Sequence, residues 1–260
     1  MMAFSLKPLR QQIIVITGAT SGIGLTTARM AARRGARLVL AGRTEGALIE
    51  LERELSQGQH RAVTVTADVG KAADVQRISR VARQMFGGFD TWINNAGVSM
   101  YGRLLDEPIE DMRRLFETNF WGLVYGSLEA ARYFKAHDQA GAIINVGSTL
   151  SDRALVLQGM YSASKHAVKA FTDALRMEVE MDHIPISVTL IQPGAIATPY
   201  SQHAKNYMKM EPTNPPPVYS PDTVPKTILY CAENRDRHVY VGAGVKGIGM
   251  MGYPMARRLC

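Results

Sequence analysis

The sequence has few of the features that mark several large classes of protein. Its 260 residues include only two cysteines, Cys231 and Cys260, which form neither a disulfide framework nor a metal-ligand spacing. No uninterrupted apolar run reaches the roughly 18 residues that cross a membrane. The run at residues 13–16 is too short for a signal peptide and leads straight into glycines. We therefore expect a cytoplasmic protein with no metal and no transmembrane span.

The sequence has fewer acidic than basic residues. It contains 23 Asp and Glu and 30 Lys and Arg, which gives a net charge of +7. A basic balance can indicate binding to nucleic acid. Here the basic residues are scattered, with short pairs such as Arg33-Arg34, and no basic run is interleaved with aromatic residues. We expect no nucleic-acid partner, although the positive charge would suit an anionic cofactor.

Short apolar runs rich in β-branched residues alternate along the chain with longer segments of helical period. The runs predict strands at residues 13–17, 37–41, 62–66, 91–93, 142–146, 186–191 and 238–241. The other segments predict helices at residues 22–34, 45–56, 72–86, 109–134 and 161–181. This alternation is typical of an α/β fold with a Rossmann-type doubly wound parallel sheet. We predict one domain over residues 1–260, with its core at about 12–242.

The first predicted strand runs directly into a glycine-rich turn that opens a helix. Glycines allow a tight turn and a close approach of backbone amides to a pyrophosphate, and a helix N-terminus favours negative charge. No Lys follows the glycines, so the turn is not a Walker loop. A tight turn without a ligand is the alternative. The predicted cofactor contacts in this turn are Gly18, Thr20, Ser21, Gly22, Ile23 and Gly24.

The end of the second strand bears on the choice between NAD(H) and NADP(H). Enzymes that use NAD place Asp or Glu here to bind the ribose 2′-hydroxyl, whereas a nearby Arg suits a 2′-phosphate. No acid occupies this strand end, and Arg43 follows it directly. The sequence therefore favours NADP(H) over NAD(H). In the alternative, Arg43 is a solvated residue and Glu45 binds the ribose.

Tyr161 and Lys165 are four residues apart at the start of a predicted helix, so they share one face. A tyrosine has a pKa of about 10, and a nearby cation lowers it by about 1–3 units. With Lys165 beside it, Tyr161 becomes a usable proton donor and acceptor. The spacing alone is common, so the pair needs further support.

That support comes from polar residues at predicted strand ends. Ser148 follows the strand at 142–146, where its hydroxyl could orient a carbonyl oxygen, or could be an ordinary turn serine. Asn94-Asn95-Ala96-Gly97 follows the strand at 91–93. Asn119 lies inside a predicted helix, where asparagine is unfavourable, so it marks either a helix distortion or a member of a polar relay.

In this order, the motifs resemble the short-chain dehydrogenase/reductase family in its single-domain form. The resemblance runs from Gln12 to about Gly242 and also includes Asp68 and Pro193-Gly194. It implies an oxidoreductase that acts on CH–OH groups with NAD(P)⁺ as acceptor. Tyr161 would be the general acid/base.

The resemblance also implies roles for the remaining residues. Lys165 would lower the pKa of Tyr161 and hold the nicotinamide ribose, Ser148 would polarise the substrate oxygen, and Asn119 would hold a water of a proton relay. The other implied cofactor contacts are Asp68 and Val69 at the adenine, Asn95, Ala96 and Gly97 at its ribose, and Pro193, Gly194, Ile196 and Thr198 at the nicotinamide and phosphates.

Two segments bear on partners. Residues 200–220, with Tyr207 and Tyr219, match the segment that covers the substrate in this family, which predicts a small hydrophobic alcohol or ketone; a packed surface loop is the alternative. The apolar tail at 243–260 could cover the pocket, join an interface or touch a membrane surface. We expect a homo-oligomer, a dimer or tetramer, with the long helices at the dimer contact.

Three other functions are open to the same sequence. A non-catalytic NAD(P)-binding sensor would share the glycine turn but lose the Tyr161 and Lys165 pair. A sugar-nucleotide epimerase would carry a larger C-terminal domain than the short stretch after Gly194 allows. A nucleic-acid-binding protein would bind with a strong dependence on salt.

Overall fold

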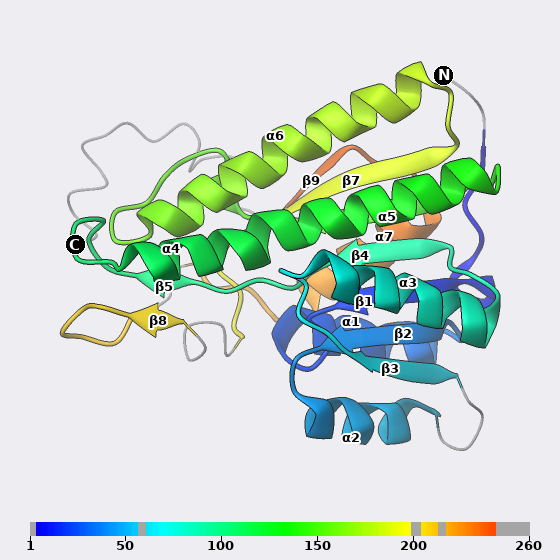
Figure 1. Ribbon diagram of the computed structural model, residues 1–260, viewed down its shortest axis with the longest axis horizontal. Coiled ribbons are helices and arrows are strands. Elements are labelled where there is room, and N and C mark those ends of the chain that lie inside the picture. Colours follow the sequence, from blue (N-terminus) through cyan, green and yellow to red (C-terminus); the bar gives the residue numbers. More distant parts are fainter. Residues whose placement is uncertain (1–3, 57–60, 199–203, 213–216, 243–260) are drawn as a thin grey trace.

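A computed structural model describes residues 4–56, 61–198, 204–212 and 217–242 of the chain. Its centre is a parallel sheet of seven strands in the order β3-β2-β1-β4-β6-β7-β9 (Figure 1). The strands are β1 (Ile13–Thr17), β2 (Arg37–Gly42), β3 (Ala62–Thr66), β4 (Thr91–Asn94), β6 (Gly141–Val146), β7 (Ile186–Pro193) and β9 (His238–Val241). The predicted Rossmann-type parallel sheet is confirmed.

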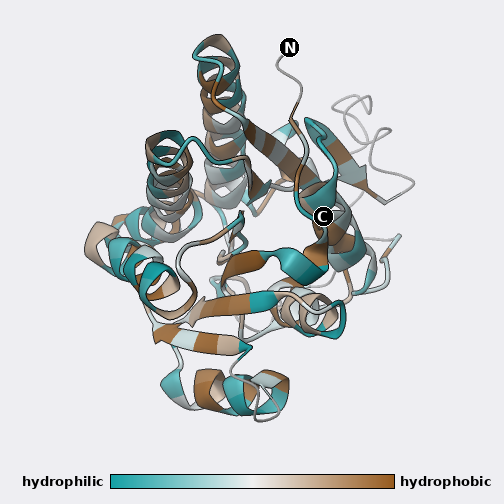
Figure 2. Ribbon diagram, turned by 90° about the vertical axis from the view of Figure 1, so that its right-hand side faces the viewer, coloured by the Kyte–Doolittle hydropathy of each residue, from teal (hydrophilic) through white to brown (hydrophobic). Residues whose placement is uncertain are grey.

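Helices cover both faces of the sheet (Figure 2). Strand residues alternate between two cores because successive side chains point to opposite faces. Ile14 and Ile16 of β1 pack with one layer of helices, and Ile13 and Val15 pack with the other. The first layer is α1 (Gly22–Arg33), α2 (Glu45–Ser56) and α7 (Thr223–Glu233); the second is α3 (Ala72–Phe86), α5 (Gly122–Ala136) and α6 (Gly159–Met181).

The predicted helix at 109–134 is three pieces in the structure. It consists of α4 (Ile109–Phe116), a π-helical turn (Glu117–Trp121) and α5. Asn119 lies in the π-helical turn and is almost fully buried. The helix distortion suggested by this asparagine is therefore present.

Helix α7 was not among the predicted helices. It begins at Thr223, just after a proline-rich stretch, and Pro225 lies in its first turn, where proline is tolerated. Val224, Ile228 and Leu229 are buried against the first core at helical spacing. This apolar spacing could have predicted the helix from sequence, but the nearby prolines suggested a loop.

A small second sheet lies beside the main one at the α4 end of the molecule (Figure 1). It pairs β5 (Met100–Tyr101) with β8 (Lys205–Asn206), so part of the 200–220 segment is tied to the loop after β4. Asp111 of α4 accepts hydrogen bonds from Lys205 and from the Tyr207 hydroxyl, which adds a side-chain clasp.

Two further points concern the partners predicted from sequence. Within the ranges given above, no helix combines the length and apolar character needed to cross a membrane. The tail at 243–260 and residue Tyr200 of the substrate-covering segment lie outside the described residues.

Candidate active site

The glycine-rich turn joins β1 to α1, and it leaves no room for a side chain at Gly18 or Gly24. Gly18 and Gly22 have φ of 66° and 50°, a left-handed conformation that glycine adopts without strain. A Cβ on Gly24 would lie 2.1 Å from the Gly18 carbonyl oxygen. The N-terminal turn of α1 therefore packs directly on the loop. This is the geometry that exposes backbone amides to an anion.

The segment after β4 holds the glycine turn in place. The Asn95 amide donates to the carbonyl oxygens of Thr17 and Gly18, at 3.0 and 3.1 Å. The Thr17 hydroxyl oxygen accepts hydrogen bonds from the backbone N–H groups of Asn95 and Ala96. Asn94, the last residue of β4, links this strand to its neighbours. Its side chain donates to Asn145 of β6 and Ser127 of α5.

Arg43 and the glycine turn lie side by side. The backbone N–H of Ala19 donates to the carbonyl of Ala41 at 3.1 Å. A Cβ on Gly42 would lie 3.3 Å from the Thr20 side chain. Arg43, the next residue, is exposed, as is Glu45 two residues later. The structure thus brings the predicted Arg43 to the edge of the predicted pyrophosphate loop.

Asp68 and Val69 follow β3 at the same edge of the sheet. The Asp68 carboxylate accepts from Arg114 at 2.7 Å and from the backbone N–H of Gly70 at 3.1 Å. Both of its oxygens therefore have protein partners. Val69 is buried against Gly122, where an added Cβ would lie 2.7 Å from it.

Tyr161 and Lys165 lie in the first turns of α6 and are both buried. The Lys165 Nζ donates a 2.8 Å hydrogen bond to the carbonyl of Val146, the last residue of β6. It also lies 5.8 Å from the centre of the Tyr161 ring. Burial lowers the pKa of Lys165 to about 8, so its ammonium remains charged at neutral pH. The predicted pair is brought together at a strand end.

Asn119 reaches from the π-helical turn to the segment after β4 and to α6. Its Oδ1 accepts from the backbone N–H of Val98 at 2.8 Å, and its Nδ2 donates to the Val98 carbonyl at 2.9 Å. The same Nδ2 donates to the Ser164 hydroxyl, which donates to the Tyr161 carbonyl. A Cβ on Gly97 would contact both Asn119 Oδ1 and Lys165 Nζ. The sequence did not predict that Ser164 would link Asn119 to the helix that carries Tyr161.

Ser148 follows β6 and caps the short 3₁₀ helix η3 (Thr149–Ser151). Its Oγ accepts from the backbone N–H of Leu150 at 3.1 Å, and its own N–H donates to the Ser151 hydroxyl at 3.2 Å. This capping box fixes the serine at the strand end. Ser148 is two residues after Val146, whose carbonyl accepts from Lys165.

The segment that follows β7 borders the glycine turn. The Gly194 N–H donates to the Val241 carbonyl, and Ile196 pairs with Tyr219 across an isolated bridge. A Cβ on Gly22 would lie 3.6 Å from the Thr198 side chain. The Pro193–Thr198 segment therefore runs from the end of β7 to the glycine turn.

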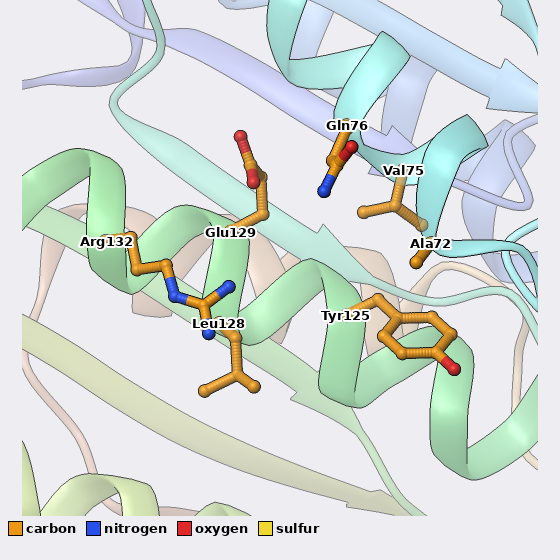
Figure 3. A pocket seen from close by; sticks show the side chains of 7 residues that line it. All are labelled: Ala72, Val75, Gln76, Tyr125, Leu128, Glu129 and Arg132. Atoms are coloured by element: carbon orange, nitrogen blue, oxygen red, sulfur yellow. The ribbon is translucent and has the colours of Figure 1, made fainter.

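A shallow hollow elsewhere on the surface is not part of this arrangement. It encloses about 60 Å³ between α3 and α5 and is lined by Ala72, Val75, Gln76, Tyr125, Leu128, Glu129 and Arg132 (Figure 3). None of these residues belongs to the strand ends described above. Its volume is also far below the ~300 Å³ at which ligand pockets begin.

The comparison with known proteins places this chain in a family. Residues 12–209 match the family described as short chain dehydrogenase. The chain is 49% identical over 248 residues to the uncharacterized oxidoreductase YxnA of Bacillus subtilis, covering 95% of this chain and 70% of that protein. The chain therefore belongs to the short-chain dehydrogenase/reductase family. It is an oxidoreductase of the class that acts on CH–OH groups.

Two more relatives have assigned names. The mouse dehydrogenase/reductase SDR family member 7B is 39% identical over 200 residues, which cover 75% of this chain and 61% of that protein. The diacetyl reductase [(S)-acetoin forming] of Staphylococcus epidermidis is 33% identical over 165 residues and 64% of either chain. This chain thus spans under two thirds of the length of both proteins.

Solved structures agree with the fold. A short-chain dehydrogenase/reductase from Burkholderia phymatum in complex with NAD has a TM-score of 0.86 at 23% identity, covering 99% of this chain and 97% of that one. An alcohol dehydrogenase from Thermococcus sibiricus complexed with 5-hydroxy-NADP has a TM-score of 0.76 at 25% identity, covering 88% and 95%. Binding of a nicotinamide nucleotide is common to these structures.

Proposed function

We propose that this protein interconverts a hydrophobic ketone and its alcohol, with Tyr161 as general acid/base and with a preference for NADP(H). The observation that carries the proposal is the convergence of Tyr161, Lys165, Asn119 and Ser148. These residues come from α6, the π-helical turn and the end of β6, and contacts through Ser164 and the Tyr161 ring join Asn119, Tyr161 and Lys165. Such an arrangement suits proton transfer to an oxygen held beside Ser148.

The residues present fit a dinucleotide. Gly18, Gly22 and Gly24 leave the backbone of the turn bare at the N-terminus of α1, as a pyrophosphate requires. Asp68, Val69, Asn95, Ala96 and Gly97 would line the adenosine side, and Pro193, Gly194, Ile196 and Thr198 the nicotinamide side. When bound, the nicotinamide supplies or accepts a hydride at the substrate carbon.

The protein residues handle the proton. In the reducing direction, the Tyr161 hydroxyl gives its proton to the carbonyl oxygen, and in the oxidising direction it removes the proton from the alcohol. The Lys165 ammonium favours the ionised phenol by its charge, since it lies near the ring and remains protonated at neutral pH. Ser148 donates a hydrogen bond to the substrate oxygen. Asn119 holds a water that returns protons to Lys165 from solvent.

The preference for NADP(H) rests on Arg43. It is exposed directly after β2, whose last residue, Gly42, lies against Thr20, and no acid occupies the strand end. A guanidinium binds a phosphate with two charge-assisted hydrogen bonds. The 2′-phosphate of NADP(H) is the group that would use them. Glu45, the alternative ribose ligand, is the first residue of α2 and is exposed as well.

The substrate class follows from the apolar surroundings of Tyr161. Its ring packs with Met100 and Leu115, and Leu150 and Tyr207 border that group. One relative is named as a diacetyl reductase, which favours a small ketone. We further propose that the protein acts as a homo-oligomer in the cytoplasm. The alternative of a non-catalytic sensor is not favoured, because the chain retains the tyrosine and lysine pair.

The test is a screen for turnover followed by one substitution. Purified protein is incubated with NADPH or NADH and with diacetyl, acetophenone, cyclohexanone or an 11-keto steroid, and nicotinamide absorbance is followed. We expect reduction of at least one ketone, faster with NADPH. Tyr161→Phe should lower kcat by about 10²–10⁴-fold with the NADPH dissociation constant unchanged.

Two outcomes would contradict the proposal. Absence of turnover with all ketones and both cofactors, in protein that binds NADPH, would favour the sensor. A Tyr161→Phe variant with wild-type kcat would remove the assigned acid. Tyr230→Phe is the matched control, because Tyr230 is exposed on α7 and away from the site.

A further inference from the structure

A partly buried polar cluster adjoins the Ser148 turn. At its centre is Asp152, the residue that ends η3. Its Oδ2 accepts hydrogen bonds from Gln192 Nε2 of β7 and from the Tyr240 hydroxyl of β9, both at 2.9 Å. Its Oδ1 accepts from Lys169 of α6. One carboxylate therefore joins four elements around the proposed site.

Gln192 connects this carboxylate to Ser148. The Gln192 side chain is fully buried, and its Nε2 donates both to Asp152 and to the Ser148 carbonyl, at 3.2 Å. Its Oε1 is buried with no hydrogen-bond partner among the described residues. A buried unpaired oxygen is costly, so the amide keeps this orientation only because two acceptors require its NH₂ group. Asp152 is one of these acceptors.

Lys169 connects the same carboxylate to the helix that carries Tyr161. Tyr161, Lys165 and Lys169 are spaced four residues apart on α6, so they share one face. Burial opposes ionisation of Asp152, but hydrogen bonds from Lys169, Tyr240 and Gln192 outweigh it and lower the pKa of the carboxyl. The ionised Asp152 thus holds both the helix face and the serine turn.

We propose that Asp152 is a positioning residue for the reaction, a role that rests on the proposed function of Ser148 and Tyr161. Through Gln192 it fixes the Ser148 carbonyl, and through Lys169 it fixes the α6 face relative to that turn. Asp152 need not contact the reacting atoms. Without the Asp152 carboxylate, the side-chain amide of Gln192 can rotate so that its unpaired oxygen finds a donor. The hydrogen bond from Gln192 to the Ser148 carbonyl is then lost.

Asp173 provides a matched control on the same helix. It lies one turn beyond Lys169 and accepts hydrogen bonds from Arg176 and from His238 of β9, both at 2.8 Å. Like Asp152, it ties α6 to β9 and is partly buried. Among the residues that the structure describes, its side chain makes no hydrogen bond to Gln192 or to the Ser148 turn. Loss of Asp173 therefore weakens the α6–β9 contact while the hydrogen bonds from Asp152 to Gln192 and Lys169 stay in place.

The experiment compares Asp152→Leu, Asp152→Asn, Asp173→Leu, Ser148→Ala and the double variant Ser148→Ala/Asp152→Leu. For each, we would measure kcat and KM with NADPH and the ketone of the panel above that is reduced fastest, the dissociation constant of NADPH by fluorescence, and Tm. We expect Asp152→Leu to lower kcat at least ~10-fold, in the range of a mispositioned catalytic group. Asp152→Asn, which keeps one acceptor, should lose less.

The double variant separates positioning from general loss of structure. Residues that act as a unit give non-additive losses. We expect the double variant to match Ser148→Ala within about twofold, NADPH binding to be unchanged, and Asp173→Leu to retain wild-type kcat. Additive losses, an equal loss in Asp173→Leu, or wild-type kcat in Asp152→Leu would overturn the role of Asp152.

Failure of the proposed function would be visible separately. If Ser148→Ala retains wild-type kcat, the assignment of Ser148 is wrong and the role of Asp152 is overturned with it. If Ser148→Ala is impaired while Asp152→Leu is not, only the positioning role is lost. Should Asp152→Leu fail to fold, Asp152→Asn and its double variant with Ser148→Ala are judged by the same non-additivity.

Discussion

The Lys165 ammonium donates a hydrogen bond to the Val146 carbonyl, 2.8 Å away at the carboxyl end of β6. Ser148 lies two residues farther along the same segment. One strand end thus fixes the position of the lysine and of the serine. Because the bond uses a backbone carbonyl, the pairing depends on how α6 packs on the sheet.

Stability should depend on the protonation of Lys165. Burial lowers its pKa from 10.5 to about 8, equivalent to ~3 kcal/mol. Between these values the unfolded state binds more protons than the folded state, so this group makes the protein more stable as pH rises. Relative to Lys165→Met, the wild-type free energy of unfolding should therefore increase between about pH 8 and pH 10.

Urea unfolding at several pH values measures this difference. Lys135→Met is the control, since the Lys135 side chain is 62% exposed on α5. The difference in free energy of unfolding between wild type and Lys135→Met should stay nearly constant over the same pH range. A parallel change in both comparisons would show that the effect does not come from Lys165.

Arg43→Ala should weaken NADPH selectively. The loss of a charge-assisted contact to a phosphate costs about 1.5–3 kcal/mol, or roughly tenfold to a hundredfold in the dissociation constant. The constant for NADH should change less than twofold by the same reasoning. Isothermal titration of both cofactors measures this. Arg53→Ala, an exposed arginine in the last turn of α2, should affect neither, and equal weakening of both cofactors by Arg43→Ala would refute the 2′-phosphate contact.

Gly24→Ala should disrupt the glycine turn, whereas Gly46→Ala should not. A Cβ at Gly24 would lie 2.1 Å from the Gly18 carbonyl oxygen and 2.5 Å from the Asn95 amide, but at Gly46 it would meet nothing within 4 Å. We expect Gly24→Ala to cost about 1–3 kcal/mol and most of the NADPH affinity. Gly46→Ala should add about 0.5–1 kcal/mol by favouring helix.

Denaturant unfolding and NADPH titration check this pair of glycines. Both residues are helical, so the comparison removes the intrinsic preference of alanine for helix. Equal effects at the two positions would mean that the turn adapts to a side chain and is not a rigid cradle.

Asn119→Ala should destabilise the protein and impair turnover. It removes the acceptor and the donor that pair with the backbone of Val98, and unpaired buried groups cost about 1–3 kcal/mol each. Asn234→Ala, an exposed asparagine that ends α7, should stay within about 0.5 kcal/mol of wild type. Thermal unfolding checks both. Unchanged stability of Asn119→Ala would show that the π-helical turn does not depend on this clasp.

Local sequence predicted most elements because their hydrophobic period was clear. The strand at 13–17 and the helices at 45–56 and 72–86 have the predicted bounds. Two helical features were not predicted, because the local sequence signals there conflicted. The prolines near α7 obscured its apolar spacing, and a single helix was expected where Asn119 lies in a π-helical turn. Both outcomes depend on packing with segments distant in sequence.

The candidate site divides in the same way. The spacing of Tyr161 and Lys165 put both on one helix face, and the glycine spacing required a bare turn, because these properties depend on neighbouring residues alone. The contacts of Asp152 with Gln192, Lys169 and Tyr240 depend on the order of β6, β7 and β9 in the sheet. Residues up to 88 positions apart meet there only after the chain has folded. The sequence determined which residues could carry the chemistry, and the tertiary structure decided which others hold them in place.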